Sequence, residues 1–117
     1  MNIILPAYLK CALWSSTQDD GLPFDRNFEI KHFSLSAIQK ANKEIKSFLA
    51  DLKKRKIDWQ DMMSETALGH DLWLTRNGHG TGFWDRDLHQ GDALTACAHL
   101  LGKSYVYQGN DGELHFH

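Results

Sequence analysis

The chain has 117 residues, of which 42% are hydrophobic and 24% charged, with a formal net charge of −2. These values predict one folded domain, residues 1–117, whose core needs neither disulfides nor a structural metal. The weak negative charge gives no overall attraction to nucleic acid or to an anionic membrane. No apolar run approaches the roughly 20 residues of a membrane span, and the first residues lack a secretion signal, so we expect a cytoplasmic protein.

The first half of the chain predicts two helices separated by a loop. Pro6 suits the first turn of a helix that reaches about Ser16, because the apolar residues of this stretch share one helical face. A loop rich in Asp, Gly and Pro follows. Ser34 or Ser36 then caps the longest helix, whose apolar spacing continues to about Lys54.

The middle of the chain predicts a third helix and then a β-hairpin. We expect this helix over residues 59–68, with Asp58 as its cap and Gly69 as its stop. Residues 71–87 then contain an alternating run, Leu72 to Arg76, a turn-rich segment that begins with Asn77-Gly78, and a second run through Phe83 and Trp84. This order predicts a β-hairpin.

The last third predicts a fourth helix and a second hairpin. Asp92 suits the cap of a helix that reaches about Leu101. Residues 104–108 and 113–117 alternate around a Gly-Asn-Asp-Gly turn. Because no βαβ pattern occurs, we expect an α+β fold of about four helices, with two antiparallel hairpins forming one small sheet.

The two cysteines, Cys11 and Cys97, each lie in an apolar helical pattern. This setting favours two reduced thiols in the core over a disulfide.

Polar and aromatic residues gather around the first predicted hairpin. Neither a turn nor a core requires two arginines, a histidine and an aspartate so close together. Because Trp and Arg dominate protein interfaces, we predict a binding surface here. Its residues are Arg76, Asn77, His79, Trp84, Asp85 and Arg86.

Three strings of the sequence carry a resemblance to a known family. They are ALWSSTQDDG at residues 12–21, LTRNGHGTGFWDRD at residues 74–87, and the ending YVYQGNDGEL. Together they resemble a family of small uncharacterised proteins of tailed phages. The resemblance implies a phage or prophage origin and expression inside a bacterium, and it supplies no catalytic residues.

Other functions compete with binding at the same cluster. His79, Asp85 and His89 are potential metal ligands, but their spacing matches no established pattern. His79 with Asp85 and Arg86 would suit a general base, an orienting carboxylate and an anion clamp, whereas a structural ion-pair network uses the same residues. Because no catalytic or phosphate-binding motif is present, we predict no catalytic residue, no metal site and no cofactor.

We therefore predict a phage accessory protein that binds and modulates a host protein, such as a defence or replication factor. A small hydrolase or metal-dependent enzyme is the first alternative. A nucleic-acid-binding protein is the second alternative. The acidic residues beside the arginines disfavour it, because they would repel phosphate groups. The sequence indicates no membrane association and leaves self-association open.

Overall fold

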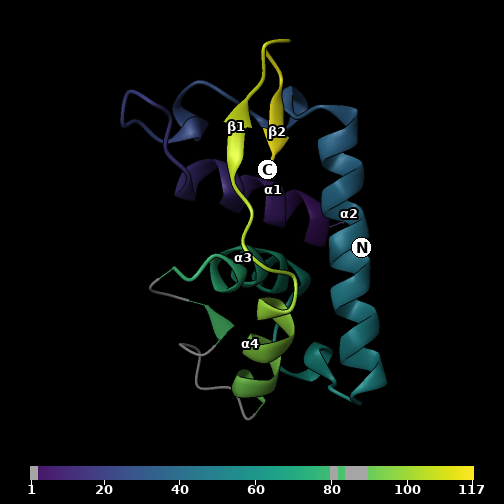
Figure 1. Ribbon diagram of the computed structural model, residues 1–117. Coiled ribbons are helices and arrows are strands. Elements are labelled where there is room, and N and C mark those ends of the chain that lie inside the picture. Colours follow the sequence, from purple (N-terminus) through teal and green to yellow (C-terminus); the bar gives the residue numbers. More distant parts are fainter. Residues whose placement is uncertain (1–2, 80–81, 84–89) are drawn as a thin grey trace.

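The computed structural model describes residues 3–79, 82–83 and 90–117. Over these residues the chain forms four α-helices, three short 3-10 turns and one two-stranded antiparallel sheet (Figure 1). The helices are α1 (Ile4–Ser15), α2 (Leu35–Lys54), α3 (Glu65–Arg76) and α4 (Gly91–His99), and the strands are β1 (Val106–Gln108) and β2 (Leu114–Phe116). The α+β class is confirmed.

Helix α2 begins where the sequence predicts. The Ser34 hydroxyl accepts a hydrogen bond from the Ala37 backbone N–H at 3.0 Å, which satisfies one free donor of the first turn. The helix runs alongside the rest of the molecule (Figure 1). It buries one apolar stripe, made of Ala37, Ala41, Ile45, Phe48 and Leu52.

The prediction of a first hairpin is wrong, because residues 65–76 form helix α3. Its N-cap is Ser64, whose hydroxyl accepts from the Ala67 N–H at 3.1 Å, and residues 59–61 form only a 3-10 turn. Every residue from Asp71 to Arg76 is buried. A helical segment that is buried on all sides, like these six residues, has no solvent-facing side, so its sequence lacks the 3.6-residue period. The alternation of Leu72 to Arg76 was therefore mistaken for a strand.

Gly69 does not stop a helix but lies inside α3, where α3 crosses α1. A Cβ at Gly69 would overlap the backbone carbonyl oxygen of Ile4 and would come within 3.1 Å of the Ala7 Cβ. Glycine here allows the two helix backbones to approach closely, which offsets its low helix propensity.

The C-terminal helix and hairpin follow the sequence prediction with one change. Helix α4 begins after Gln90, so Asp92 lies in the first turn and is not the cap. Strands β1 and β2 pair with Tyr107 opposite His115. Leu114 and Phe116 face the core, in keeping with the alternation of residues 113–117.

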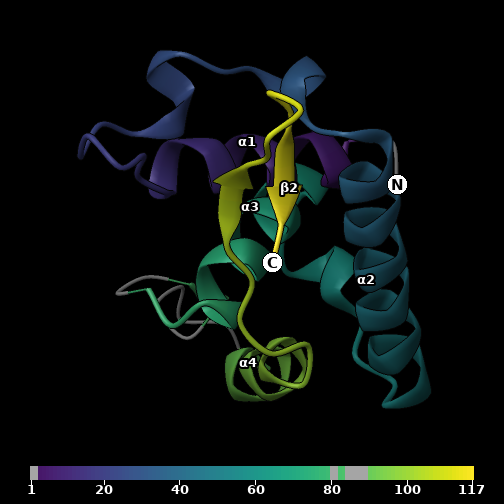
Figure 2. The ribbon, with the colours of Figure 1, turned by 45° about the horizontal axis from the view of Figure 1, so that its top comes forward.

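The hairpin lies in front of α1 in both views (Figures 1 and 2). An aromatic cluster joins it to the helices. The Phe116 ring lies 5.6 Å from the Trp73 ring of α3 and 6.4 Å from the Tyr8 ring of α1. The Tyr8 and Trp73 rings meet edge to face at 5.4 Å. The hairpin is therefore fixed on the α1–α3 pair by buried apolar surface.

Both cysteines are free and buried, as predicted. None of the described helices is both long enough and apolar enough to cross a bilayer.

Candidate binding site at the free edge of β1

The structure separates the residues of the predicted binding cluster. Arg76 is only 3% exposed, and its guanidinium is held by internal partners. It donates to the carbonyl oxygens of Gly102 at 2.8 Å and Leu101 at 3.0 Å, and to the Tyr8 hydroxyl at 2.9 Å. Both Glu44 carboxylate oxygens lie 3.1 Å from its terminal nitrogens. Burial raises the pKa of Tyr8 to about 12, so Tyr8 stays a neutral partner.

Asn77 and His79 lie at the C-terminal end of α3. The Asn77 side chain donates to the Trp73 carbonyl at 3.0 Å and accepts from the Ser104 backbone N–H at 2.8 Å. Asn77 therefore joins the end of α3 to the segment that leads into β1. His79 is exposed beside it. Trp84, Asp85 and Arg86 lie outside the described residues, as does His89.

The edge of β1 that faces away from β2 has free backbone groups. Tyr105 and His117 exchange two hydrogen bonds, at 3.4 and 2.8 Å, and the Gly109 N–H donates to Glu113. In an antiparallel ladder, hydrogen-bonded and non-bonded pairs alternate. The N–H and C=O groups of Val106 and Gln108 therefore point away from β2. No described segment pairs with them.

The opposite edge of the sheet is covered. The Leu114 carbonyl, which points away from β1, accepts from the Ser34 N–H at 2.9 Å, and Phe33 forms a parallel bridge with Leu114. Among the described residues, only the β1 edge remains available for a further strand. A free strand edge is a ready template for pairing with another chain.

A groove borders this free edge. The segment after α1, dark blue in Figure 1, lies on the β1 side of the hairpin. Between this segment and β1 are two pockets, of about 270 and about 400 Å³, which share Thr17 and Val106 in their walls. We call them the Ser104 pocket and the Asp19 pocket.

The Ser104 pocket has polar walls of a particular kind. It lies at the C-terminal ends of both α1 and α3, and its lining residues are Ser15, Ser16, Thr17, Trp73, Asn77, His79, Ser104, Tyr105 and Val106. Helix C-termini carry partial negative charge. The Ser15 hydroxyl already accepts from the Trp73 indole N–H at 2.8 Å. The Ser104 hydroxyl, in contrast, is buried and has no partner among the described residues.

The Asp19 pocket continues along β1. Thr17, Gln18, Asp19, Asp20 and Phe24 line one side, and Val106, Tyr107 and Gln108 line the other. Both aspartates are exposed. Among the described residues no lysine or arginine lines either pocket, so the groove favours a positively charged occupant.

Two exposed tyrosines lie on the outer face of β1. Tyr105 is 59% exposed and Tyr107 is 44% exposed. The Tyr107 ring stacks on His115 at 5.4 Å. Exposed tyrosines next to a free strand edge supply the rigid contact surface that interfaces use.

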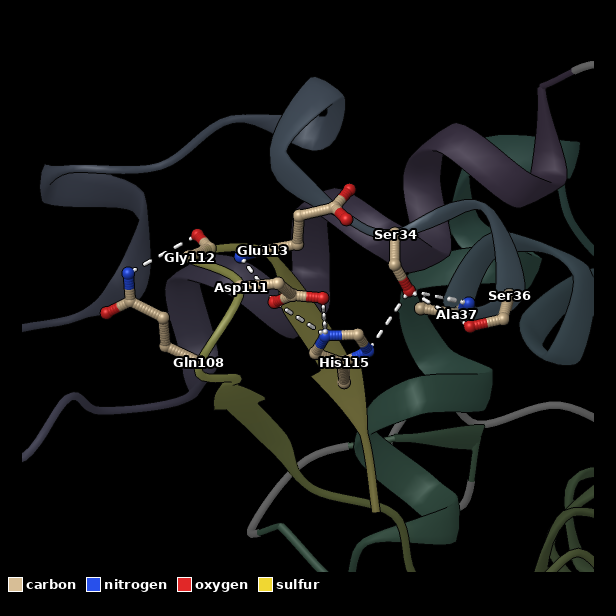
Figure 3. A network of polar contacts seen from close by, with 8 residues as sticks. All are labelled: Ser34, Ser36, Ala37, Gln108, Asp111, Gly112, Glu113 and His115. Carbon is tan, nitrogen blue, oxygen red and sulfur yellow. Dashed lines mark hydrogen bonds and ion pairs between the residues drawn. The ribbon is translucent and has the colours of Figure 1, made fainter.

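A hydrogen-bonded network of Ser34, His115 and Asp111 positions the hairpin (Figure 3). The Ser34 hydroxyl lies 3.1 Å from His115 Nδ1, and His115 Nε2 lies 3.1 Å from both Asp111 carboxylate oxygens. These are the residue types of a hydrolase triad. However, Ser34 is only 5% exposed, and its hydroxyl also caps α2. The network thus ties the hairpin to the start of α2.

Sequence reasoning missed most of this site. Ser104 and Thr17 carried no signal, because single hydroxyl residues are common in loops. The Ser104 pocket brings together three distant segments, which supply Ser15 to Thr17, Asn77 with His79, and Tyr105 with Val106.

The described residues contain no cluster of three or more side chains suited to hold a metal ion. Comparisons with protein-family models, with curated proteins and with solved structures found no match for this chain.

Proposed function

We propose that this protein binds an extended segment of another protein, which adds as a third strand to the free edge of β1. In keeping with the phage resemblance of the sequence, the partner is a bacterial host protein whose activity the binding modulates. The observation that carries this proposal is the pattern of free N–H and C=O groups at Val106 and Gln108, on an edge that adjoins a groove.

Strand addition combines two sources of affinity. Main-chain hydrogen bonds join the added strand to β1, and pockets receive its alternate side chains. The β1 edge has free backbone groups at Val106 and Gln108 for such hydrogen bonds, and the Ser104 and Asp19 pockets follow one another along the same edge. The exposed Tyr105 and Tyr107 add contact surface on the outer face.

The charge of the groove favours a partner other than a second copy of this chain. Two copies that paired through β1 would bring their Asp19 and Asp20 side chains toward each other's groove. Like charges at an interface disfavour association. A host segment with basic side chains has the complementary charge.

The substitution Gln108→Pro tests strand addition. It removes an outward N–H without removing any hydrogen bond to β2, and proline is tolerated on edge strands. The matched control is Gln108→Ala, which also loses the side chain but keeps the N–H. Gln108→Pro loses one backbone hydrogen bond to the added strand, and its pyrrolidine ring occupies space at the edge. Together these effects should weaken binding by about tenfold or more.

The assay is affinity capture from a bacterial lysate, followed by titration of the purified partner. We expect wild-type protein and Gln108→Ala to capture the same partner, and Gln108→Pro to lose it. Equal capture by all three folded proteins would refute strand addition at β1. A dimer seen by analytical ultracentrifugation, lost in Gln108→Pro, would identify a second copy as the occupant instead.

A hydrolase is the second candidate function, because Ser34, His115 and Asp111 contact one another in the order of a catalytic triad. The two imidazole nitrogens are exchanged relative to such a triad, since Ser34 contacts Nδ1 and Asp111 contacts Nε2. Turnover of a p-nitrophenyl ester that disappears in Ser34→Ala but persists in Ser36→Ala would favour it. We expect no turnover above background in any of these proteins. Nucleic-acid binding is disfavoured by the acidic groove, and a gel-shift assay at low salt would test it directly.

A further inference from the structure

The buried hydroxyl of Ser104 lacks the partner that such groups ordinarily have. Ser104 is 3% exposed, and its Oγ makes no hydrogen bond to any described residue. Most buried polar side-chain atoms in proteins are hydrogen-bonded, and an unpaired one costs stability. Ser104 lines the pocket at the ends of α1 and α3, but its Oγ has almost no accessible surface. A change of the Ser104 rotamer would be needed to bring the hydroxyl to a ligand there, which would then supply the missing bond.

The geometry of an added strand determines which of its residues reach this pocket. Side chains alternate between the two faces of a strand, so residues two apart, roughly 7 Å, lie on one face. Ser104, Val106 and Gln108 are likewise two apart along the edge. One inward side chain of the added strand therefore enters the Ser104 pocket, and the next inward side chain enters the Asp19 pocket.

The chemistry of both pockets selects the same type of side chain. The Ser104 pocket presents hydroxyl oxygens and lies at two helix C-termini, where positive charge is stabilised. The Asp19 pocket is lined by Asp19 and Asp20, and Asp20 Oδ1 also accepts from the Leu22 backbone N–H at 3.0 Å. The nearby guanidinium of Arg76 is already paired with Glu44 and does not line either pocket.

We infer that the bound segment carries lysines at alternate positions, one with its ammonium group hydrogen-bonded to Ser104 and the next paired with Asp19 and Asp20. This inference rests on the proposed strand addition and names the chemistry of the partner. An ammonium group can donate to the hydroxyl oxygen. The hydroxyl alone would also accept a carboxylate or phosphate as a partner, and it is the two helix C-termini and the aspartates along the groove that disfavour an anion.

The probe is a fluorescein-labelled peptide of four Thr-Lys repeats, acetylated and amidated at its ends. Three control peptides accompany it. One has glutamine in place of every lysine, one has glutamate, and one has four threonines followed by four lysines, which keeps the charge but removes the alternation. Binding is measured by fluorescence anisotropy at low and at physiological salt, because exposed charge pairs weaken as salt rises.

We expect the alternating lysine peptide to bind at least fivefold more tightly than the block peptide. Its advantage over the glutamine and glutamate peptides should be larger. Ser104→Ala should weaken the alternating lysine peptide by about tenfold, since hydrogen bonds to charged groups are strong, and should leave the block peptide unchanged. Because Ser104→Ala removes an unpaired buried group, it should not lower the melting temperature. Asp19→Asn with Asp20→Asn should also weaken the alternating peptide.

The outcomes separate this inference from the proposed function. If lysine and glutamine peptides bind equally and Gln108→Pro weakens both, strand addition stands and the lysine preference is refuted. If the lysine peptide responds to Ser104→Ala but not to Gln108→Pro, the pocket assignment holds and strand addition is refuted. No binding of the alternating lysine peptide at millimolar concentration would overturn the inference.

Discussion

Replacement of the buried Arg76 by methionine should strongly destabilise the fold. Methionine has a similar length and keeps the apolar packing, but it leaves the Glu44 carboxylate, the Tyr8 hydroxyl and two backbone carbonyls without their donor. Removal of one partner of a buried ion pair costs about 3 to 5 kcal/mol. Because the Glu44 side chain is 22% exposed, water will partly replace the lost donor, so we expect about 3 kcal/mol.

Urea unfolding monitored by circular dichroism measures this loss. Small domains have only about 5 to 15 kcal/mol of stability, so the midpoint should fall clearly at an unchanged slope. The matched control is Arg55→Met, which breaks the exposed ion pair with Asp51 and should leave the midpoint unchanged. A difference between Arg76→Met and wild type below about 1 kcal/mol would refute the structural role assigned to Arg76.

Three further predictions concern other parts of the fold. Gly69→Ala should lower the unfolding free energy by about 2 kcal/mol, because the α1 and α3 backbones must separate. Gly78 has φ +70° and no atom near its missing Cβ, so Gly78→Ala should lower the unfolding free energy by only about 1 kcal/mol. Burial raises the pKa of the Cys11 thiol to about 12, so iodoacetamide at pH 8 should modify Cys11 only after urea unfolding; rapid labelling of folded protein would contradict its burial. The hydrogen bond from the Glu113 backbone N–H, and then that from His115, hold the pKa of Asp111 below its usual range. The stability that this carboxylate contributes is present above its unfolded pKa of about 3.9 and is lost as pH falls through the lower folded value. The urea midpoints of wild type and Asp111→Asn should therefore differ at pH 6 and converge near pH 2, and a constant difference would refute this linkage.

Two elements, helix α2 and the C-terminal hairpin, could be predicted because residues close together in the sequence determine them. Helix α2 has a serine cap and one buried stripe, and the C-terminal hairpin has alternating side chains around a Gly-rich turn. Gly78 has the positive φ that Asn77-Gly78 predicts. In these segments one face is buried and the other exposed, so the period of the sequence reports the structure.

Helix α3 was missed because tertiary burial removed that signal. Its C-terminal half is enclosed on all sides, and Gly69, which usually marks a helix end, is required there by the contact with α1. The same error placed Arg76 on a hairpin surface. In the structure its charge is satisfied inside the fold, by residues 8, 44, 101 and 102, which no local pattern connects.

The candidate site depends on contacts between distant segments, which explains why the sequence indicated it only in part. Ser104 becomes unusual only when its hydroxyl is buried without a partner. Among the described residues, β1 provides the one free strand edge because Phe33 and Ser34 cover the far side of β2. Asn77 and His79 were selected from the sequence as binding residues, and both line the Ser104 pocket. That they contact a partner remains a prediction.

Amide hydrogen exchange at β1, measured by NMR with and without the captured partner or the alternating lysine peptide, tests strand addition most directly. In the free protein the Val106 and Gln108 N–H groups point away from β2 and should exchange quickly, whereas the Tyr107 N–H, which faces His115, should already be protected. Strand addition predicts that binding slows exchange at Val106 and Gln108 and changes Tyr107 little. Binding that leaves Val106 and Gln108 in fast exchange would contradict it.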